Sequence, residues 1–169
     1  MRCIAKVLGL ILCLGLAAGV LAQEKKIMKK DLPVPVLSSF QKAYPGATIK
    51  GLAREVEEGK TYFEIESVEG KVKRDLLYLA DGTLVEIEET VGEADLPIPV
   101  KAAAAARYPK GKVVRAEKVT RGGAVSFELR VRVGKAQIEM SIDAAGKVLK
   151  ESKGSIRTEG KEAGEKDQR

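Results

Sequence analysis

The residues that most often carry catalysis or hold a metal are missing from most of this chain. None of its 169 residues is His, and the two cysteines, Cys3 and Cys13, lie close to the amino terminus. The usual general base, thiolate nucleophile and His or Cys metal ligands therefore have no candidates after residue 13. Asp143 followed by Gly146 offers too few oxygen ligands for a calcium loop. We therefore expect no catalytic residue, no bound metal and no cofactor.

Two remaining patterns resemble catalytic ones and are better explained by structure. Ser39-Phe40-Gln41-Lys42 has the S-x-x-K spacing of certain serine hydrolases, but the companion S-D-N and K-T-G elements are absent. The adjacent carboxylates at Glu57-Glu58 and Glu88-Glu89 fall at expected strand ends and turns, where solvation explains them better than proton transfer does. The sequence thus predicts a protein that is not an enzyme.

The first 22 residues have the pattern of a secretory signal peptide. Arg2 and Lys6 form a basic start, an apolar run follows, and Ala22 is small enough to precede a cleavage site. An uncleaved membrane anchor is the alternative, but it needs roughly 17 to 25 apolar residues, and this run is shorter. We expect an exported protein, periplasmic or extracellular, whose mature chain begins at Gln23 and has no cysteine for a disulfide.

The rest of the chain contains an internal similarity with an offset of 64 residues. The stretch DLPVPVLSSFQKAYPGAT at residues 31–48 corresponds to DLPIPVKAAAAARYPKGK at residues 95–112. Without a gap, the same offset pairs Gly59 with Gly123 and Phe63 with Phe127. Matches at turn and core positions over such a length indicate an internal duplication.

Each copy reads as one helix followed by four strands. Asp31 or Asp95 can cap a helix that tolerates prolines in its first turn, and Pro45 ends the first helix. The stretch AVSFELRVRV alternates apolar and polar residues, which is typical of a half-buried strand. Gly-containing turns separate such runs. The strands are expected near residues 48–57, 61–69, 72–79, 83–88, 112–120, 124–133, 136–142 and 147–151.

The predicted fold class is therefore α+β, with two tandem repeats of one helix plus a four-stranded antiparallel meander. The repeats span residues 31–94 and 95–152, and they either share a core or form one continuous eight-stranded sheet with the helices on one face. Residues 23–30 are expected to be a short, mobile basic lead. Residues 153–169 have one large apolar residue and read as a disordered charged tail.

The order of these elements resembles the PepSY-like domains of exported bacterial proteins, which are similar in fold to beta-lactamase inhibitor protein. The resemblance rests on Leu-Pro, a helix, Tyr-Pro-Gly, EEGKTYFEIE and a final DG turn, and it covers residues 31–152. It implies tandem units in one long sheet and a non-enzymatic binding module, with inhibition, chaperoning or sensing among the roles of such proteins. Because the mature chain lacks Cys and Trp, no contact residue of the inhibitor is transferred to it.

The two copies differ in charge. Residues 31–94 hold 13 acidic and 7 basic residues, a net charge of −6, whereas residues 95–152 hold 6 acidic and 12 basic residues, a net charge of +6. The favoured function is binding of an unknown protein or peptide of the cell envelope, with an inhibitor-like or regulatory role. The alternative is a structural envelope protein that self-assembles because its two copies have opposite net charges. Random drift of solvent-exposed charges after the duplication would also explain the charge difference. The sequence does not determine the oligomeric state.

Nucleic acid and anionic surfaces are two further classes of partner. Nucleic acid is not expected, because the basic copy lacks interleaved aromatic residues and the chain is exported. Weak contact with an anionic surface is expected only through the lysines of the basic lead, which are Lys25, Lys26, Lys29 and Lys30.

The candidate binding surface is an apolar patch on the sheet face that the helices leave open. Alignment of the two copies places Leu77 and Leu79 outward, with Tyr62 and Val68 on a neighbouring row. Exposed contiguous apolar side chains often mark an interface. Arg130 and Arg132 occupy the matching outward rows of the second copy and complete the candidate set. A local bulge or a covering loop would instead remove the patch.

Overall fold

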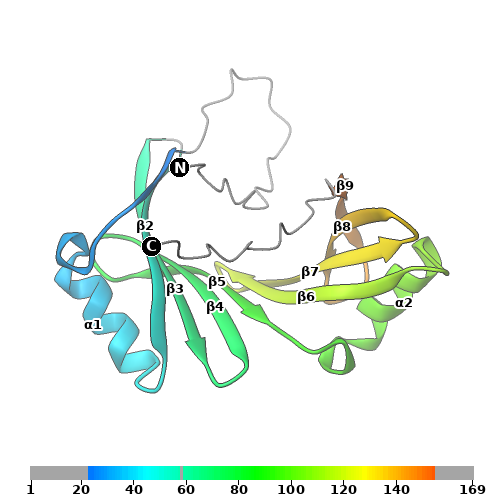
Figure 1. The fold of residues 1–169 in the computed structure, drawn as a ribbon, viewed down its shortest axis with the longest axis horizontal. Helices are drawn as coiled ribbons and strands as arrows, with labels where there is room; N and C mark the ends of the chain where they lie inside the picture. The colour runs from blue at the N-terminus through cyan, green and yellow to red at the C-terminus, as the bar shows by residue number, and fades with distance from the viewer. Residues whose placement is uncertain (1–22, 58, 155–169) are drawn as a thin grey trace, which may run out of the picture. The chain divides into compact units, whose positions relative to one another are not determined.

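The computed structural model describes residues 23–57 and 59–154 (Figure 1). The predicted signal peptide and nearly all of the predicted tail lie outside these residues. Among the helices that the structure describes, none is both long enough and apolar enough to cross a membrane.

The strands form one antiparallel sheet in which every strand lies next to its neighbours in the sequence. The order is β1-β2-β3-β4-β5-β6-β7-β8-β9. The bounds are β1 Gln23–Lys26, β2 Thr48–Glu57, β3 Lys60–Glu69, β4 Val72–Tyr78, β5 Leu84–Thr90, β6 Lys112–Arg121, β7 Ala124–Val133, β8 Ala136–Asp143 and β9 Val148–Gly154.

Each α-helix is preceded by a short 3-10 helix. The order along the chain is η1 Lys29–Asp31, α1 Val34–Ala43, η2 Glu93–Asp95 and α2 Ile98–Arg107. Both α-helices begin after a proline and carry another proline in the first turn, where the backbone N–H groups have no helical partner. Asp31 does not cap α1 as expected: its carboxylate accepts the backbone N–H of Met28 at 3.2 Å.

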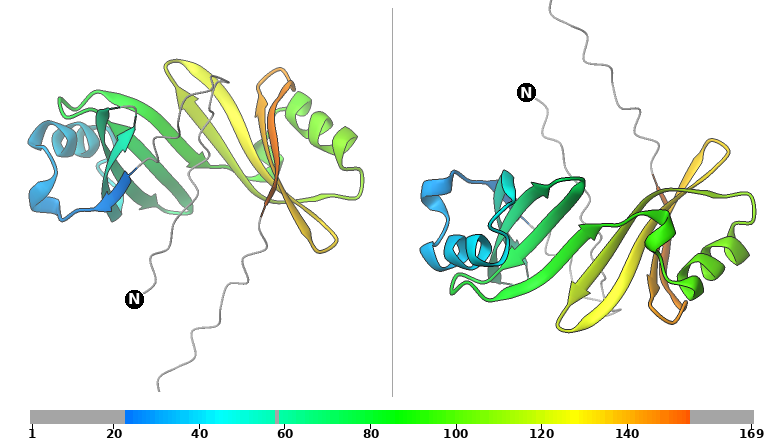
Figure 2. Two further views of the ribbon diagram at one scale, coloured as in Figure 1. Left: turned by 90° about the horizontal axis from the view of Figure 1, so that it is seen from above. Right: turned by 90° about the horizontal axis from the view of Figure 1, so that it is seen from below.

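Helix α1 covers one face of the sheet formed by β2, β3, β4 and β5 (Figures 1 and 2). Val36 and Phe40 point from the helix into a core that is completed by strand residues. The buried strand members are Phe63, Ile65, Leu76 and Tyr78. The turn between β4 and β5 passes close to the helix, because a Cβ added to Gly82 would lie 2.7 Å from the carbonyl oxygen of Pro35.

Helix α2 packs against β8. It buries Val100 and Ala104, so its contribution to the core is smaller in volume than that of α1. The strands supply most of the apolar bulk, with buried side chains at Phe127, Leu129, Val131, Ile138, Met140 and Ile142.

The predicted fold class is wrong in its division of the chain. The structure is a single nine-stranded antiparallel sheet with two α-helices, and not two repeats of a helix plus a four-stranded meander. Two compact units exist, but unit 1 combines the described residues up to Val91 with Glu117–Ser126, and unit 2 combines Gly92–Ala116 with the described residues from Phe127. The physical reason is pairing: β5 pairs with the end of β6 from Glu117 to Arg121, so this stretch is integrated into unit 1.

The ninth strand comes from the segment that was expected to be a mobile lead. Residues 23–26 form β1, which pairs antiparallel with β2 from Ala53 to Val56. The backbone N–H of Ile27 then donates to the carbonyl of Leu52 at 3.0 Å. Backbone pairing of this kind does not require apolar alternation, which explains why the polar sequence QEKK gave no strand signal.

Candidate functional site

One row of side chains crosses unit 1 on the sheet face opposite α1. Phe63, Ile65, Leu76 and Tyr78 face α1, and successive residues of a strand point to opposite faces. Glu64 and Leu77 therefore lie on the other face. The register from β1 to β6 continues the row as Lys26, Ala53, Glu64, Leu77, Glu86 and Arg121.

The row places one carboxyl group between two apolar side chains. Glu64 is directly opposite Ala53 on β2 and Leu77 on β4, and these residues are 6%, 3% and 5% exposed. The cations of the row stand at its ends, on β1 and β6. A carboxyl group in these surroundings loses hydration without gaining a neighbouring charge, which disfavours its ionised form.

A second carboxyl group lies diagonally from Glu64. Glu55 is opposite Glu24 on β1 and Tyr62 on β3, so it is one diagonal step from Glu64 on the same face. Diagonal neighbours in an antiparallel pair are about 7 to 8 Å apart, which long side chains can span. Glu55 is 5% exposed, and we refer to Glu55 and Glu64 together as the buried carboxyl pair.

Burial and nearby carboxylates raise the pKa of both groups. The pKa of Glu64 rises from 4.5 to about 8, first because of lost hydration and then because of the charge of Glu55. The pKa of Glu55 rises from 4.5 to about 6, again chiefly through lost hydration, followed by the charge of Glu24. At neutral pH the pair therefore holds close to one proton, mostly on Glu64.

The adjacent carboxyl group of the row has a cation. The guanidinium of Arg121 on β6 donates to the carboxylate of Glu86 on β5. Arg121 also lowers the pKa of Glu55, against the larger raising effects. Among the described residues, neither member of the buried carboxyl pair has a hydrogen bond or ion pair of its own. The face thus contains one compensated acid beside two that lack compensation.

On the α1 side of the sheet the acids are paired. Arg74 on β4 binds Glu69 at 2.9 Å and Glu89 at 2.8 Å, and its guanidinium lies 4.8 Å from the ring centre of Tyr44. The Arg74 side chain is 13% exposed, so these contacts are largely shielded from water. Each of these two acids thus has an ion pair, which neither Glu55 nor Glu64 has among the described residues.

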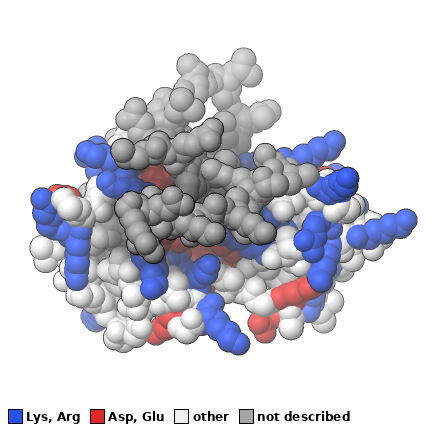
Figure 3. Space-filling view, in the orientation of Figure 1, with Lys and Arg blue, Asp and Glu red and all other residues white. Residues whose placement is uncertain are grey.

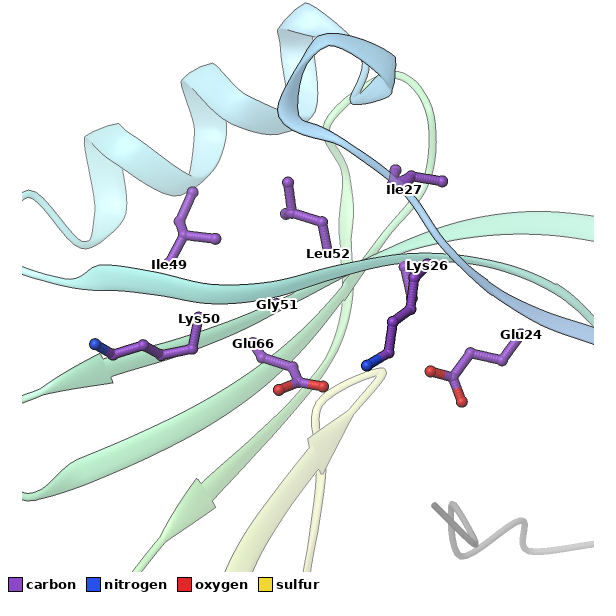
Figure 4. Close-up of a pocket in the computed structure, with 9 residues that line it drawn as sticks. Glu24, Lys26, Ile27, Ile49, Lys50, Gly51, Leu52 and Glu66 are labelled. Carbon is purple, nitrogen blue, oxygen red and sulfur yellow. The ribbon is translucent and has the colours of Figure 1, made fainter. Parts of the chain in front are cut away.

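A hollow of about 340 Å³ lies beside the first half of β2, where β1 no longer pairs with it. The amino group of Lys26 points between the carboxylates of Glu24 and Glu66, whereas Ile49 and Leu52 point toward α1 (Figure 4). A second hollow, of about 570 Å³, lies between the end of α1 and β2. Neither hollow is lined by Glu55 or Glu64. In the part of the chain that is described, no group of three acidic, His or Cys side chains could hold a metal ion.

The structure places the residues of the predicted patch less openly than expected. Leu77 is buried in the centre of the row, while Tyr62, Val68 and Leu79 are half-buried. Tyr62 and Val68 share the face of Leu77 by register. Leu77, which was expected to be an exposed part of the apolar patch, is instead buried between Glu64 and Glu86.

The arginines of the candidate set, Arg130 and Arg132, belong to unit 2. Arg130 is half-buried and its guanidinium binds Glu139 at 3.1 Å, whereas Arg132 is exposed. The four lysines proposed to contact an anionic surface are all exposed, two on β1 and two on η1. In the space-filling view, Lys and Arg side chains extend outward, and Asp and Glu show as smaller areas (Figure 3).

The sequence interpretation missed the buried carboxyl pair. It considered acids that are adjacent in the sequence, but adjacent strand residues point to opposite faces and do not meet on one face. The available signal was the alternation in TYFEIE, where Glu64 shares a face with Tyr62. Only the register of β2 against β3 brings Glu55 beside it.

Comparison with known proteins identifies the fold and no family. No protein-family profile matches the chain, and no curated protein matches its sequence. Among solved structures, a DUF2874 family protein from Bacteroides uniformis is similar with a TM-score of 0.59 and 17% identity, over 72% of this chain and 88% of that one.

Two further solved structures are similar to the same degree. A protein from Bacteroides eggerthii that is predicted to be periplasmic has a TM-score of 0.61 and 19% identity, over 72% of this chain and 88% of that one. A BLIP-like protein from Bacteroides fragilis has a TM-score of 0.57 and 18% identity, over 75% and 89% of the two chains. At such identities the likeness shows the fold alone, and that fold is BLIP-like, as in proteins similar to beta-lactamase inhibitor protein.

Proposed function

We propose that this chain is an exported, non-enzymatic binding module that takes up a protein or peptide on the face of unit 1 opposite α1. The observation that carries the proposal is the buried carboxyl pair, which lies on a sheet face and forms no ion pair with the described residues. Perturbed carboxyl groups gather at functional sites more often than elsewhere. Export is supported by the predicted signal peptide and by the predicted periplasmic location of a protein with a similar fold.

The choice between binding and catalysis follows from the surroundings of the pair. Two carboxyl groups with different pKa values could act as an acid and a base. A catalytic pair, however, normally lines a cavity that holds the substrate, and the two hollows found in the described residues are lined by other side chains. A strand face without such a cavity is better suited to a macromolecular partner, and we therefore assign the face to binding.

Selection of peptides from a random-sequence display library against the chain tests this function. Retained peptides should perturb backbone amide resonances of β2 to β5, and Glu55→Lys should weaken their binding. Glu93→Lys is the matched control, because Glu93 is exposed on η2 and the change in net charge is identical. The proposal fails if no peptide is retained, or if the perturbed resonances are confined to α1.

Self-association is the second candidate, supported by the opposite net charges of residues 31–94 and 95–152. Assembly held by such charges should dissolve when salt shortens the screening length to roughly 3 Å at about 1 M. Light scattering after size exclusion would report the mass at low and high salt. A monomer under all conditions would exclude this candidate and leave the binding proposal intact.

A further inference from the structure

Neither Glu55 nor Glu64 has an ion pair with a described residue, whereas three other acids of unit 1 have one. Glu86 has Arg121, and the acids Glu69 and Glu89 share Arg74. Glu55 and Glu64 are buried to a similar or greater degree, and the charged groups near them on the face are mostly acidic. The charged groups around them are Glu24, Lys26, Glu57, Glu66, Asp75, Glu86 and Arg121.

A buried carboxylate without a partner is costly to fold, so a face that keeps two of them requires a reason. Protonation lowers the cost in the free protein, since a neutral carboxyl group needs less hydration. A cation supplied from outside would lower it in another way, because it would compensate the charge and donate hydrogen bonds. Protonation and cation binding can be distinguished, because a bound cation favours the ionised carboxylate and so releases the proton to solvent.

We propose that the face of unit 1 binds a cationic segment of a partner protein, with an arginine side chain placed between Glu55 and Glu64. This inference rests on the proposed function and names the chemistry of its partner. An arginine fits better than a lysine, because its planar guanidinium has five N–H donors and can serve two carboxylates at once. The ring of Tyr62, which is half-buried on the same face, would contact the methylene stem.

Two observations support a partner of positive charge. The face already accommodates one guanidinium, since Arg121 is bonded to Glu86 one strand away from Leu77. The segment 31–94, which supplies most of the face, carries 13 acidic against 7 basic residues and attracts cations at longer range as well.

Isothermal titration of the full chain with tetra-arginine tests the inference, and tetra-citrulline is the uncharged control of nearly identical shape. Because the pKa of Glu64 is about 8, its carboxyl group is mostly protonated near pH 7. Binding should therefore release close to one proton, which is measured by repeating the titration in buffers of different ionisation enthalpy. Tetra-citrulline should bind at least about tenfold more weakly.

Matched variants separate this site from general attraction to an acidic surface. Glu64→Gln should abolish the proton release, and Glu55→Gln combined with Glu64→Gln should weaken tetra-arginine binding by about tenfold or more. Glu93→Gln removes one exposed acid and should change the affinity by less than about twofold. Equal affinity of the chain and the double variant, or binding without proton release, would overturn the inference.

The result also distinguishes the inference from the function on which it rests. If tetra-arginine does not bind while display-selected peptides still bind on the face of unit 1, the cationic partner is wrong and the binding function stands. If neither binds, both are wrong. Circular dichroism of each variant verifies that it has folded before it is titrated.

Discussion

The stability of this protein should fall as the pH rises through the neutral range, and Glu64 should cause most of that fall. Its pKa is about 8 in the folded chain against an ordinary value of 4.5. A carboxyl group whose pKa is raised by folding stabilises the folded state fully below its ordinary pKa. This contribution is lost as the pH rises toward the folded pKa, because the unfolded chain gains stability by ionising Glu64 while the folded chain keeps the proton on it.

The magnitude follows from the same pKa difference. One pKa unit corresponds to about 1.4 kcal/mol, and between about pH 5 and pH 9 the loss assigned to Glu64 is about 4 kcal/mol in the free energy of unfolding. Glu55, with a pKa of about 6, adds about 1 kcal/mol over the same interval. Both contributions have the same sign, so the free energy of unfolding should be markedly lower at alkaline pH.

The assay is urea denaturation followed by far-ultraviolet circular dichroism at about pH 5, 7 and 9, since the chain has no Trp for fluorescence. Glu64→Gln replaces the acid with a neutral group of similar shape, and it should reduce the pH-dependent loss to about 1 kcal/mol. Glu93→Gln should behave like the unchanged chain. The reasoning is refuted if Glu64→Gln and the unchanged chain lose the same free energy between pH 5 and pH 9.

Three further changes address the framework of unit 1, each measured as a change in the free energy of unfolding. Gly82→Ala should cost about 2 to 3 kcal/mol, because the added Cβ would meet the backbone of α1. Gly59→Ala should cost only about 1 kcal/mol, because Gly59 has a similar positive φ but open space around it. Equal costs for the two variants would contradict this reasoning. Arg74→Met should cost about 1 to 2 kcal/mol, because it leaves two partly exposed carboxylates without their cation, and a cost under about 0.5 kcal/mol would show that the network is not stabilising. Tyr78→Phe should be neutral or stabilising, because the buried hydroxyl has no hydrogen-bond partner; a cost above about 1 kcal/mol would reveal one.

Alternation along the sequence was sufficient to locate most strands. The expected strand at residues 124–133 corresponds to β7 Ala124–Val133, and the expected strand at residues 48–57 corresponds to β2. Period two is a local property and needs no knowledge of partners. The division of the chain into units depends on which distant strands pair, and the contact of β5 with β6 is not encoded in either strand alone.

The same distinction explains the outcome for the site. Parity within β3 and β4 correctly placed Tyr62 and Leu77 on one face, but exposure depends on what surrounds a residue on that face. Leu77 is buried because it lies between Glu64 and Glu86, and neither neighbour is close to it in the sequence. The internal repeat and the PepSY-like resemblance stay predictions from the sequence.

The acids on the two faces of unit 1 differ in whether they have ion-pair partners. This difference indicates that the acids on the face opposite α1 serve a function and do not stabilise the fold. Around Arg74 both acids have an ion pair within the chain, so each has a partner in the free protein. Glu64 has no such partner among the residues that the structure describes, although a Gln or Leu at either position of the buried carboxyl pair would remove the cost. Retaining a destabilising arrangement is expected where a ligand completes it, because the energy withheld from folding then becomes available as binding energy.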